Sequence, residues 1–289
     1  MTREAFANYV NLGGYDFIGR GSDELRTPAQ QAKALEVCTK LGLTGLVVVG
    51  ATTSMTDCLY LTEYFERNGA ATRIIQIPAT VDGNIHHNYF QTSIGFDTAS
   101  KVYSQLVGNM LTDSASAIKY WYFIRLMGKE PSHLAVECAL QTSPNLVIVS
   151  EQCQDRHESL KNVVDYICDV ICRRADAGQN YGCILIPEGL LAHISTFNNL
   201  IIEINTLFST AKTIDEQHRM QEMLANETHL KEMLSPWTYS LFASLPDFFK
   251  QQLLVNREVE GSIKLAAIET EKLISFFVEK ELADRKKKG

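Results

Sequence analysis

The sequence predicts an α/β protein built on a doubly wound, mainly parallel sheet, with a C-terminal helical insert or subdomain. Short runs of apolar, often β-branched residues recur between residues 45 and 187, and amphipathic stretches separate them. The runs show no strict alternation of apolar and polar residues, which is typical of strands buried on both faces of a parallel sheet. Strands that alternate with helices imply right-handed βαβ crossovers.

The predicted strands are residues 45–50, 73–78, 120–127, 145–149 and 181–187. Helices are expected between them, at residues 97–113 and 159–177. In the second of these, apolar residues recur at the three- and four-residue spacing of a helix that packs on a sheet. Ser159 is placed to cap its start, and Gly178 to end it.

After about Leu191 the sequence shows no strong strand signal. Helices are predicted there, with Ser235-Pro236 and Leu245-Pro246 as interruptions, at residues 195–211, 214–234, 238–255 and 264–286. This change of character predicts an α/β body over residues 1–192 and a mainly helical region over residues 193–289.

The composition excludes several classes of protein. The formal net charge is -7, so no broad nucleic-acid-binding surface is implied. No apolar run approaches the about 20 residues that a membrane-spanning helix needs. The seven cysteines are scattered, without the spacing of a zinc knuckle or of a CxxC redox pair. These features favour a cytoplasmic protein, because free thiols are the rule in that compartment.

The residues that follow each strand are the candidate site residues, because ligands of open α/β sheets collect at the carboxyl ends of strands. The first strand leads through a turn of small residues, Gly50 to Ser54, into a helix. Free N–H groups at a helix N-terminus favour a phosphate. Ser54 with Asp57 also resembles a capping box, so a plain helix start is the alternative. The turn is not a Walker A loop, because no Gly-Lys-Ser/Thr follows.

Three other strand ends carry polar candidates. Asp82, beside a glycine, is placed to accept a proton from a bound hydroxyl, although an Asp-Gly turn is the alternative. Gly128 permits close backbone approach, Lys129 can meet a phosphate, and Ser132 is expected to cap the next helix. Glu188 can accept hydrogen bonds from sugar hydroxyls or be a turn residue. Together these positions predict phosphoryl transfer to a small hydroxylated molecule, a reaction that depends on positioning and charge stabilisation.

The order of several sequence strings resembles phosphofructokinases of the long, pyrophosphate-dependent type. The resemblance covers nearly the whole chain and is almost continuous over residues 93–151. The other strings that carry it are Gly13–Gly21, Gly50–Ser54, Pro78–Ile85, and residues 184–190, 234–237 and 268–273. It implies the phosphofructokinase α/β body with the helical insert of the long forms. It also implies a glycolytic reaction, the magnesium-supported transfer of phosphate to the 1-hydroxyl of fructose 6-phosphate.

By this resemblance, Asp82 matches the aspartate that takes the hydroxyl proton. Thr80, Met127, Gly128 and Glu188 match sugar-phosphate contacts. Lys129 stands where the family usually has arginine, and a lysine does not offer the bidentate phosphate contact of arginine.

The departures from the family pattern fall on charged positions. Thr52 and Thr53 replace the two aspartates of the phosphate-donor loop, one of which normally supports magnesium. Threonine has no charge to hold that ion. Ala79 replaces the lysine that would stabilise the transferring phosphate, and Asn84 replaces an aspartate. These changes resemble the regulatory α-type subunits, or the α-type halves of fused enzymes, and make a magnesium site in this chain doubtful.

Three hypotheses follow. The first is a regulatory or catalytically impaired phosphofructokinase half that binds a sugar phosphate and partners a catalytic half or subunit in an oligomer. The second is an active pyrophosphate- or ATP-dependent phosphotransferase, whose missing charges come from elsewhere. The third is a structural subunit with an empty pocket. The retained Asp82 argues against complete loss of function.

The chain is also expected to be a fragment of a longer polypeptide. By resemblance, family members carry a Gly-Gly-x-x-Pro-Gly loop before the Gly13-Gly14 segment and a Gly-Tyr-Glu-Gly-Arg segment after the basic end of this chain. The second of these segments supplies further sugar-phosphate contacts in the family. Because this chain lacks both, it is expected to bind ligand more weakly and to be inactive by itself.

Overall fold

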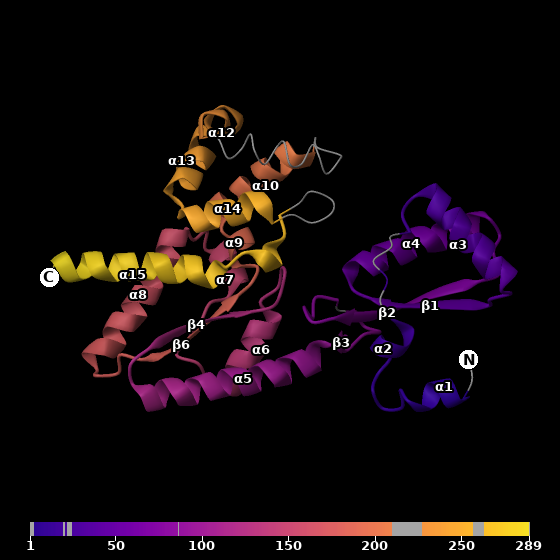
Figure 1. Cartoon of the computed structure of the whole chain (residues 1–289), viewed down its shortest axis with the longest axis horizontal. Coiled ribbons are helices and arrows are strands. Elements are labelled where there is room, and N and C mark those ends of the chain that lie inside the picture. Colours follow the sequence, from indigo (N-terminus) through magenta and orange to yellow (C-terminus); the bar gives the residue numbers. More distant parts are fainter. Residues whose placement is uncertain are drawn as a thin grey trace. The chain divides into compact units, whose positions relative to one another are not determined.

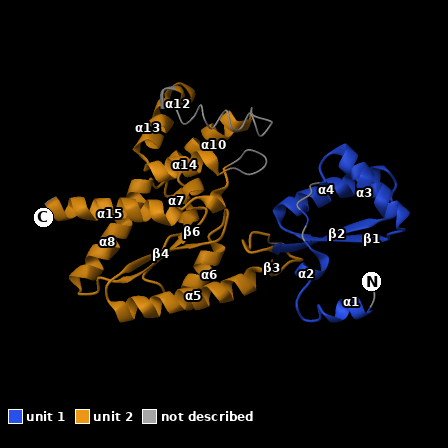
Figure 2. Ribbon diagram, in the orientation of Figure 1, with its two compact units in different colours: residues 1–79 blue, residues 80–289 orange. Residues whose placement is uncertain are grey.

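The structure is a computed structural model that describes residues 3–19, 21, 25–85, 87–209, 227–256 and 263–288. The chain divides into two compact units, Met1–Ala79 and Thr80–Gly289 (Figure 2). Each unit contains parallel strands with helices packed on them, as expected of an α/β protein. Among the helices of the described residues, none combines the length and the apolarity that a membrane crossing requires.

The first unit is built on two parallel strands, β1 (Gly45–Gly50) and β2 (Arg73–Thr80), and β2 leads the chain into the second unit. They confirm the first two predicted strands. Helices α3 (Pro28–Lys40) and α4 (Thr52–Arg67) cover one face of the pair (Figure 1). The core between helices and strands consists of the buried residues Cys38, Leu61 and Phe65, with Leu46 and Ile74 packed against them.

Among the described residues, the other face of the β1–β2 pair is apolar and exposed. It carries Val47, Val49, Ile75 and Ile77, which are 36% to 58% exposed. The prediction that the strands are buried on both faces is therefore wrong for this pair. Successive strand residues point to opposite faces, so helices on one side leave every second side chain uncovered.

Two short N-terminal helices bury none of their residues: α1 (Arg3–Ala7) and α2 (Tyr15–Ile18).

The second unit contains a parallel sheet in the strand order β4-β6-β5. Its strands confirm the three remaining predicted strands: β4 (Trp121–Leu126), β5 (Leu146–Val147) and β6 (Gly182–Pro187). All six residues of the central strand β6 are buried. The elements between β2 and β6 also include β3 (Ile94–Gly95), α5 (Phe96–Ala117), α6 (His133–Thr142), α7 (Ser150–Asp155) and α8 (Leu160–Asp176).

Helices cover both faces of β6, which confirms the doubly wound arrangement for this unit (Figure 1). Leu185 packs in a core with residues of α5 and α6. Ile184 and Ile186 belong to a larger core that includes α8. The ends of α8 agree with the sequence prediction, because Ser159 Oγ accepts the backbone N–H of Asn162 and Gly178 has a φ of 76° after the last turn.

The described residues after β6 form helices: α9 (Leu190–His193), α10 (Ser195–Ser209), α12 (Glu227–Met233), α13 (Pro236–Ser244), α14 (Asp247–Val255), the 3₁₀ helix η1 (Leu265–Ala267) and α15 (Thr270–Lys288). They share the larger core of β6 and α8 through residues such as Phe197, Phe249 and Leu273. The predicted boundary at residue 192 stays a prediction.

Three of the predicted helical segments differ in detail from the structure or fall partly outside it. The segment predicted at 238–255 forms two helices, α13 and α14, which confirms the predicted interruption at Leu245-Pro246. Proline has no N–H to donate and disfavours a helical residue before it. The helix predicted at 264–286 begins later, after η1. Of the helix predicted at 214–234, residues 214–226 lie outside the described residues.

Candidate functional site

The segment from Gly50 to Ser54, called the Gly50 loop below, joins β1 to α4 in the first unit. Helix α4 begins at Thr52, and Ala51 is its N-cap residue without a side-chain capping bond. The N–H of Met55 makes the first helical bond, to the carbonyl of Ala51. The N–H groups of the first turn therefore have no acceptor within the helix, and such a helix end attracts an anion.

The Gly50 loop depends on a close approach between its two ends. A Cβ atom at Gly50 would lie 2.3 Å from Oγ and 2.6 Å from Cβ of Ser54. The capping-box alternative for Ser54 and Asp57 is wrong, because Ser54 lies inside the first turn of α4 and makes no capping bond. The carboxylate of Asp57 instead accepts a hydrogen bond from Nε of Arg26 at 3.0 Å and is largely buried.

The Gly50 loop does not fit a magnesium ion. Thr52 and Thr53 are exposed, and α4 has no acidic residue in its first turn. Asp57, the next carboxylate along the chain, is already paired with Arg26. Magnesium sites in proteins usually include at least one carboxylate, which these residues do not offer. Within the described ranges, no group of three or more His, Cys, Asp or Glu side chains could hold a metal ion.

In the second unit, Asp82 is held by one hydrogen bond of its backbone and one of its carboxylate. Its own N–H donates to Oγ1 of Thr80 at 3.1 Å, and its Oδ1 accepts the backbone N–H of Lys129 at 3.3 Å. Gly83 has a φ of 63°, and a Cβ there would lie 2.9 Å from the ring of Phe96. This turn therefore requires glycine, and the bond from Lys129 holds the carboxylate of Asp82 beside the end of β4.

The segment Met127–Ser132, called the Lys129 turn below, follows β4 and packs tightly against the end of β6. Gly128 has a φ of 143°, and a Cβ there would lie 2.8 Å from the carbonyl oxygen of Pro131. The carbonyl of Gly128 accepts the N–H of Gly189 at 3.1 Å. Met127 is 49% exposed, and the side chain of Lys129 is also exposed.

Glu188 follows β6 and is only 7% exposed. Burial raises the pKa of its carboxyl and the charge of Asp82 adds to the rise, while Arg125, the N–H of Gly128 and Lys129 act in the opposite direction. The structure therefore brings the predicted residues of the second unit into one group, called the Asp82 cluster below: Thr80, Asp82, Met127, Gly128, Lys129 and Glu188. Two carboxyls and a cation in one place can accept a hydroxyl proton and bind an anion.

For two residues near this cluster, the structure differs from what the sequence predicts. The sequence pattern does not single out Arg125, although a charged residue inside an apolar strand is a signal of a functional or structural role. It pairs with Glu271 of α15 at 3.3 Å and donates a hydrogen bond to the carbonyl of Ile268. The capping role expected of Ser132 is wrong, because its Oγ makes no capping bond and accepts the N–H of Ser150 at 2.9 Å.

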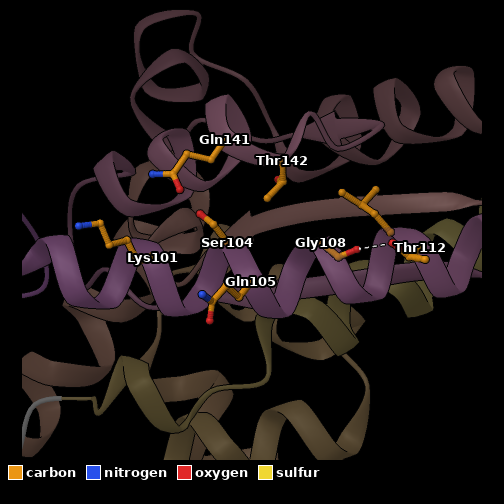
Figure 3. A pocket seen from close by; sticks show the side chains of 8 residues that line it. Lys101, Ser104, Gln105, Gly108, Thr112, Gln141 and Thr142 are labelled. Atoms are coloured by element: carbon orange, nitrogen blue, oxygen red, sulfur yellow. Dashed lines mark hydrogen bonds between the residues drawn. The ribbon is translucent and has the colours of Figure 1, made fainter.

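A shallow pocket lies away from these residues, between α5 and α6 (Figure 3). None of the candidate site residues lines it. Several of its polar side chains are already engaged, since Lys101 pairs with Asp97 at 2.7 Å and the hydroxyl of Thr112 donates to the carbonyl of Gly108. The pocket therefore offers few groups that could hold a ligand.

Comparison with known proteins assigns the chain to a family. The model of the family described as phosphofructokinase matches residues 1–234. This chain belongs to the phosphofructokinase family. The family resemblance inferred from the sequence strings is thereby confirmed, and so is the phosphofructokinase α/β fold.

Relatives of both subunit types are similar to the chain over all of its length. Pyrophosphate–fructose 6-phosphate 1-phosphotransferase subunit beta of Solanum tuberosum is 42% identical over 289 residues, and subunit alpha 2 of Arabidopsis thaliana is 40% identical. The enzyme of that name from Porphyromonas gingivalis is 39% identical. The chain covers 49%, 45% and 52% of these three proteins, so it spans about half the length of the relatives it matches.

Among solved structures, the phosphofructokinase of Pichia pastoris in the T-state matches 60% of this chain and 19% of its own, with a TM-score of 0.49 and 17% sequence identity. The similarity to alpha and beta subunits is nearly equal, so overall identity does not separate the two types. The two subunit types therefore have to be distinguished by particular residues, those of the Gly50 loop and of the Asp82 cluster.

Proposed function

We propose that this chain is part of an α-type, regulatory or catalytically impaired half of a pyrophosphate-dependent 6-phosphofructokinase. It binds a sugar phosphate at the Asp82 cluster and partners a catalytic half or subunit. The observation that carries the proposal is a contrast in charge between the Asp82 cluster and the Gly50 loop. The Asp82 cluster retains two carboxyls and a cation, whereas the first turn of α4 beside the Gly50 loop has no acidic residue.

The Asp82 cluster has the groups that a sugar phosphate requires. Asp82 is positioned to accept the proton of a sugar hydroxyl, because the Lys129 turn fixes its Oδ1. The exposed ammonium of Lys129 can pair with a phosphate. Glu188, with a raised carboxyl pKa, can accept or donate hydrogen bonds to sugar hydroxyls. Burial of part of such a site strengthens each of these polar contacts.

The Gly50 loop supports anion binding but not phosphoryl transfer. Its helix N-terminus attracts a phosphate, while Thr52 and Thr53 supply no charge for a metal ion. Ala79, near the end of β2, has no cation to stabilise a transferring phosphate, and Asn84 is neutral. We infer that bound phosphate at this loop is a ligand or a regulatory anion.

The proposal also includes an oligomer with a catalytic partner and a cytoplasmic location. The relatives are named as alpha and beta subunits, which supports an oligomer with a catalytic partner. The seven cysteines are free, six of them buried, which suits a cytoplasmic protein.

Calorimetric titration of fructose 6-phosphate and fructose 2,6-bisphosphate into the full-length protein tests binding. A coupled assay with pyrophosphate or ATP then tests turnover, with Asp82→Ala as the control. Binding without turnover is the expected result. No sugar-phosphate binding would leave only a structural subunit.

The second candidate is an active phosphotransferase, favoured by the ordered Asp82 carboxylate. Turnover that Asp82→Ala abolishes would establish it and end the impaired-half proposal. A gain of turnover in the combined variant Thr52→Asp, Thr53→Asp and Ala79→Lys, over an inactive parent, would support the impaired half. This combination restores the three charges that the resemblance identifies as lost.

A further inference from the structure

A network of polar side chains from α7 and α9 makes hydrogen bonds to the Lys129 turn. None of these side chains is a candidate site residue. The network consists of Ser150, Glu151 and Gln154 of α7 and His193 of α9. We propose that Glu151 is a positioning residue that orders the Lys129 turn and, through it, the carboxylate of Asp82. This inference rests on the proposed role of the Asp82 cluster in binding a sugar phosphate.

Two hydrogen bonds tie Ser132, at the end of the turn, to the first two residues of α7, Ser150 and Glu151. Oε1 of Glu151 accepts the backbone N–H of Ser132 at 2.8 Å. Oγ of Ser132 accepts the backbone N–H of Ser150 at 2.9 Å. Ser132 and Ser150 are 2% and 0% exposed, so water does not compete for these bonds.

His193 makes a second tie, two residues earlier in the turn. Its Nε2 lies 2.8 Å from the carbonyl oxygen of Glu130, which can only accept, so Nε2 carries the proton. Its Nδ1 lies 2.7 Å from Oε1 of Gln154 on α7. The two ties fix residues 130 and 132 from two helices that follow β5 and β6.

The charge of Glu151 strengthens the first tie. Burial would raise the pKa of its carboxyl, but hydrogen bonds from the backbone and side chain of Ser132 and the nearby His193 bring it below its ordinary value. The ionised carboxylate is thus the form that the turn stabilises. A hydrogen bond to an ionised acceptor is stronger than one to a neutral acceptor.

The other end of the turn reaches the candidate base. The N–H of Lys129 donates to Oδ1 of Asp82 at 3.3 Å, and Nδ1 of His133 lies 3.1 Å from the carbonyl oxygen of Gly83. Gly189 cannot carry a side chain, because its Cβ would lie 2.6 Å from the carbonyl oxygen of Lys129. The turn is therefore a rigid link between Glu151 and Asp82, and Glu151 itself need not touch the sugar phosphate.

The network also contains buried polar atoms that lower the stability of the fold. A role in packing alone would not explain why they are there. Oγ of Ser150 and Oε2 of Glu151 are buried and have no hydrogen-bond partner among the described residues. A buried polar atom without a partner destabilises a fold. An apolar pair at these positions would avoid that cost but would not hold the N–H of Ser132.

The test is amide hydrogen exchange on the 289-residue chain and its variants Glu151→Ala and Glu151→Gln. Glu151→Ala is expected to speed exchange at Lys129 and Ser132 about tenfold, as loss of one charged hydrogen bond would. Glu151→Gln keeps an oxygen acceptor and should restore part of the protection. Core amides of β6 should be unchanged.

Glu137→Ala and Glu137→Gln are the matched controls. Glu137 is another partly buried helical glutamate of this unit, and it accepts a hydrogen bond from Gln141 at 2.7 Å. These variants should leave the exchange of the Lys129 turn unchanged. If Glu151→Ala does not fold, Glu151→Gln decides alone, with local acceleration expected and unchanged exchange at Lys129 and Ser132 overturning the proposal.

Titration of fructose 6-phosphate separates this inference from the proposed function. Where the wild-type protein binds the sugar phosphate, Glu151→Ala should raise the Kd about tenfold, and Glu151→Gln should recover part of the loss. An unchanged Kd in Glu151→Ala would overturn the link to Asp82. If the wild-type protein binds no sugar phosphate, the proposed function fails, while the exchange data still decide whether Glu151 orders the turn.

Discussion

The backbone N–H of Lys129 donates to Oδ1 of Asp82 at 3.3 Å, although 47 residues separate the two along the chain. The main chain of Lys129 thus has the structural task, and its exposed side chain is left for a ligand. Substitutions of this side chain can therefore change phosphate affinity without moving the carboxylate of Asp82.

The first prediction concerns the charge of Lys129. Lys129→Ala should raise the Kd for fructose 6-phosphate about tenfold or more, because a charge-assisted hydrogen bond contributes roughly 1.5–3 kcal/mol. Lys129→Arg should lower the Kd several-fold, since guanidinium can bind a phosphate in a bidentate manner. Calorimetric titration measures both, and equal affinities for all three proteins would remove Lys129 from the site.

The second prediction concerns the contact between Gly50 and Ser54. Gly50→Ala should destabilise the first unit by about 1–3 kcal/mol, because the new Cβ would meet Ser54 at less than van der Waals distance. Urea unfolding measures the change. The same substitution in a Ser54→Gly background should cost clearly less, since the clashing Cβ and Oγ are then absent. An equal cost in both backgrounds would show that another contact is responsible.

The sequence predicts elements whose apolar pattern is local, and misses contacts between distant segments. Helix α8 is predicted to within a residue of its ends, because Ser159 and Gly178 mark them. The uncovered face of β1 and β2 is not predicted, because apolar runs do not show which side a helix covers. The tie from Glu151 to Ser132 is missed for a similar reason, since a helix residue and a turn 19 residues away share no spacing rule.

The candidate site shows the same division. Gly128, Lys129 and Glu188 are grouped as predicted, because β4 and β6 are parallel neighbours and place their carboxyl ends together. Asp82 follows a strand of another sheet, and the hydrogen bond from the N–H of Lys129, which no strand order predicts, brings its carboxylate to them. Ser54 and Ser132 have the composition of caps, but their hydroxyls serve other contacts or none. Such choices depend on partners that only the folded chain brings within reach.

The third prediction concerns Glu188 and pH. Burial raises the pKa of its carboxyl, so its neutral form favours the folded state. That contribution is complete below the ordinary value of 4.5 and is lost as pH rises through the raised value. Glu188→Gln is always neutral, and its stability relative to wild type should therefore increase between pH 4.5 and neutral pH.

Urea unfolding of both proteins across this range measures the difference in the free energy of unfolding. A difference independent of pH would show that Glu188 titrates normally. Fructose 6-phosphate binding should weaken in Glu188→Gln even where the fold is more stable, because a carboxylate acceptor for sugar hydroxyls is lost. In Glu188→Gln, stability should thus rise while affinity falls. These opposite changes separate the role of Glu188 in the site from its effect on the fold.

The last prediction concerns Glu203 of α10, which holds the start of α13. Its carboxylate accepts the N–H of Ser235 at 3.0 Å and the hydroxyls of Ser235 and Thr238 at 2.8 Å each. Burial opposes the ionised form, but these hydrogen bonds lower the pKa of the carboxyl below 4.5. The contribution of Glu203 is therefore complete above pH 4.5 and is lost as pH falls through the lowered value.

At pH 7, Glu203→Ala should destabilise the fold by about 2 kcal/mol, and Glu203→Gln by less, since its amide oxygen still accepts one bond. The difference between wild type and Glu203→Gln should shrink as the wild-type carboxyl becomes protonated below pH 4.5. Glu232→Gln, which changes an exposed glutamate of α12, is the control and should show no such dependence. A constant difference for Glu203→Gln from pH 7 to the acid transition would mean that shape, rather than charge, holds α13.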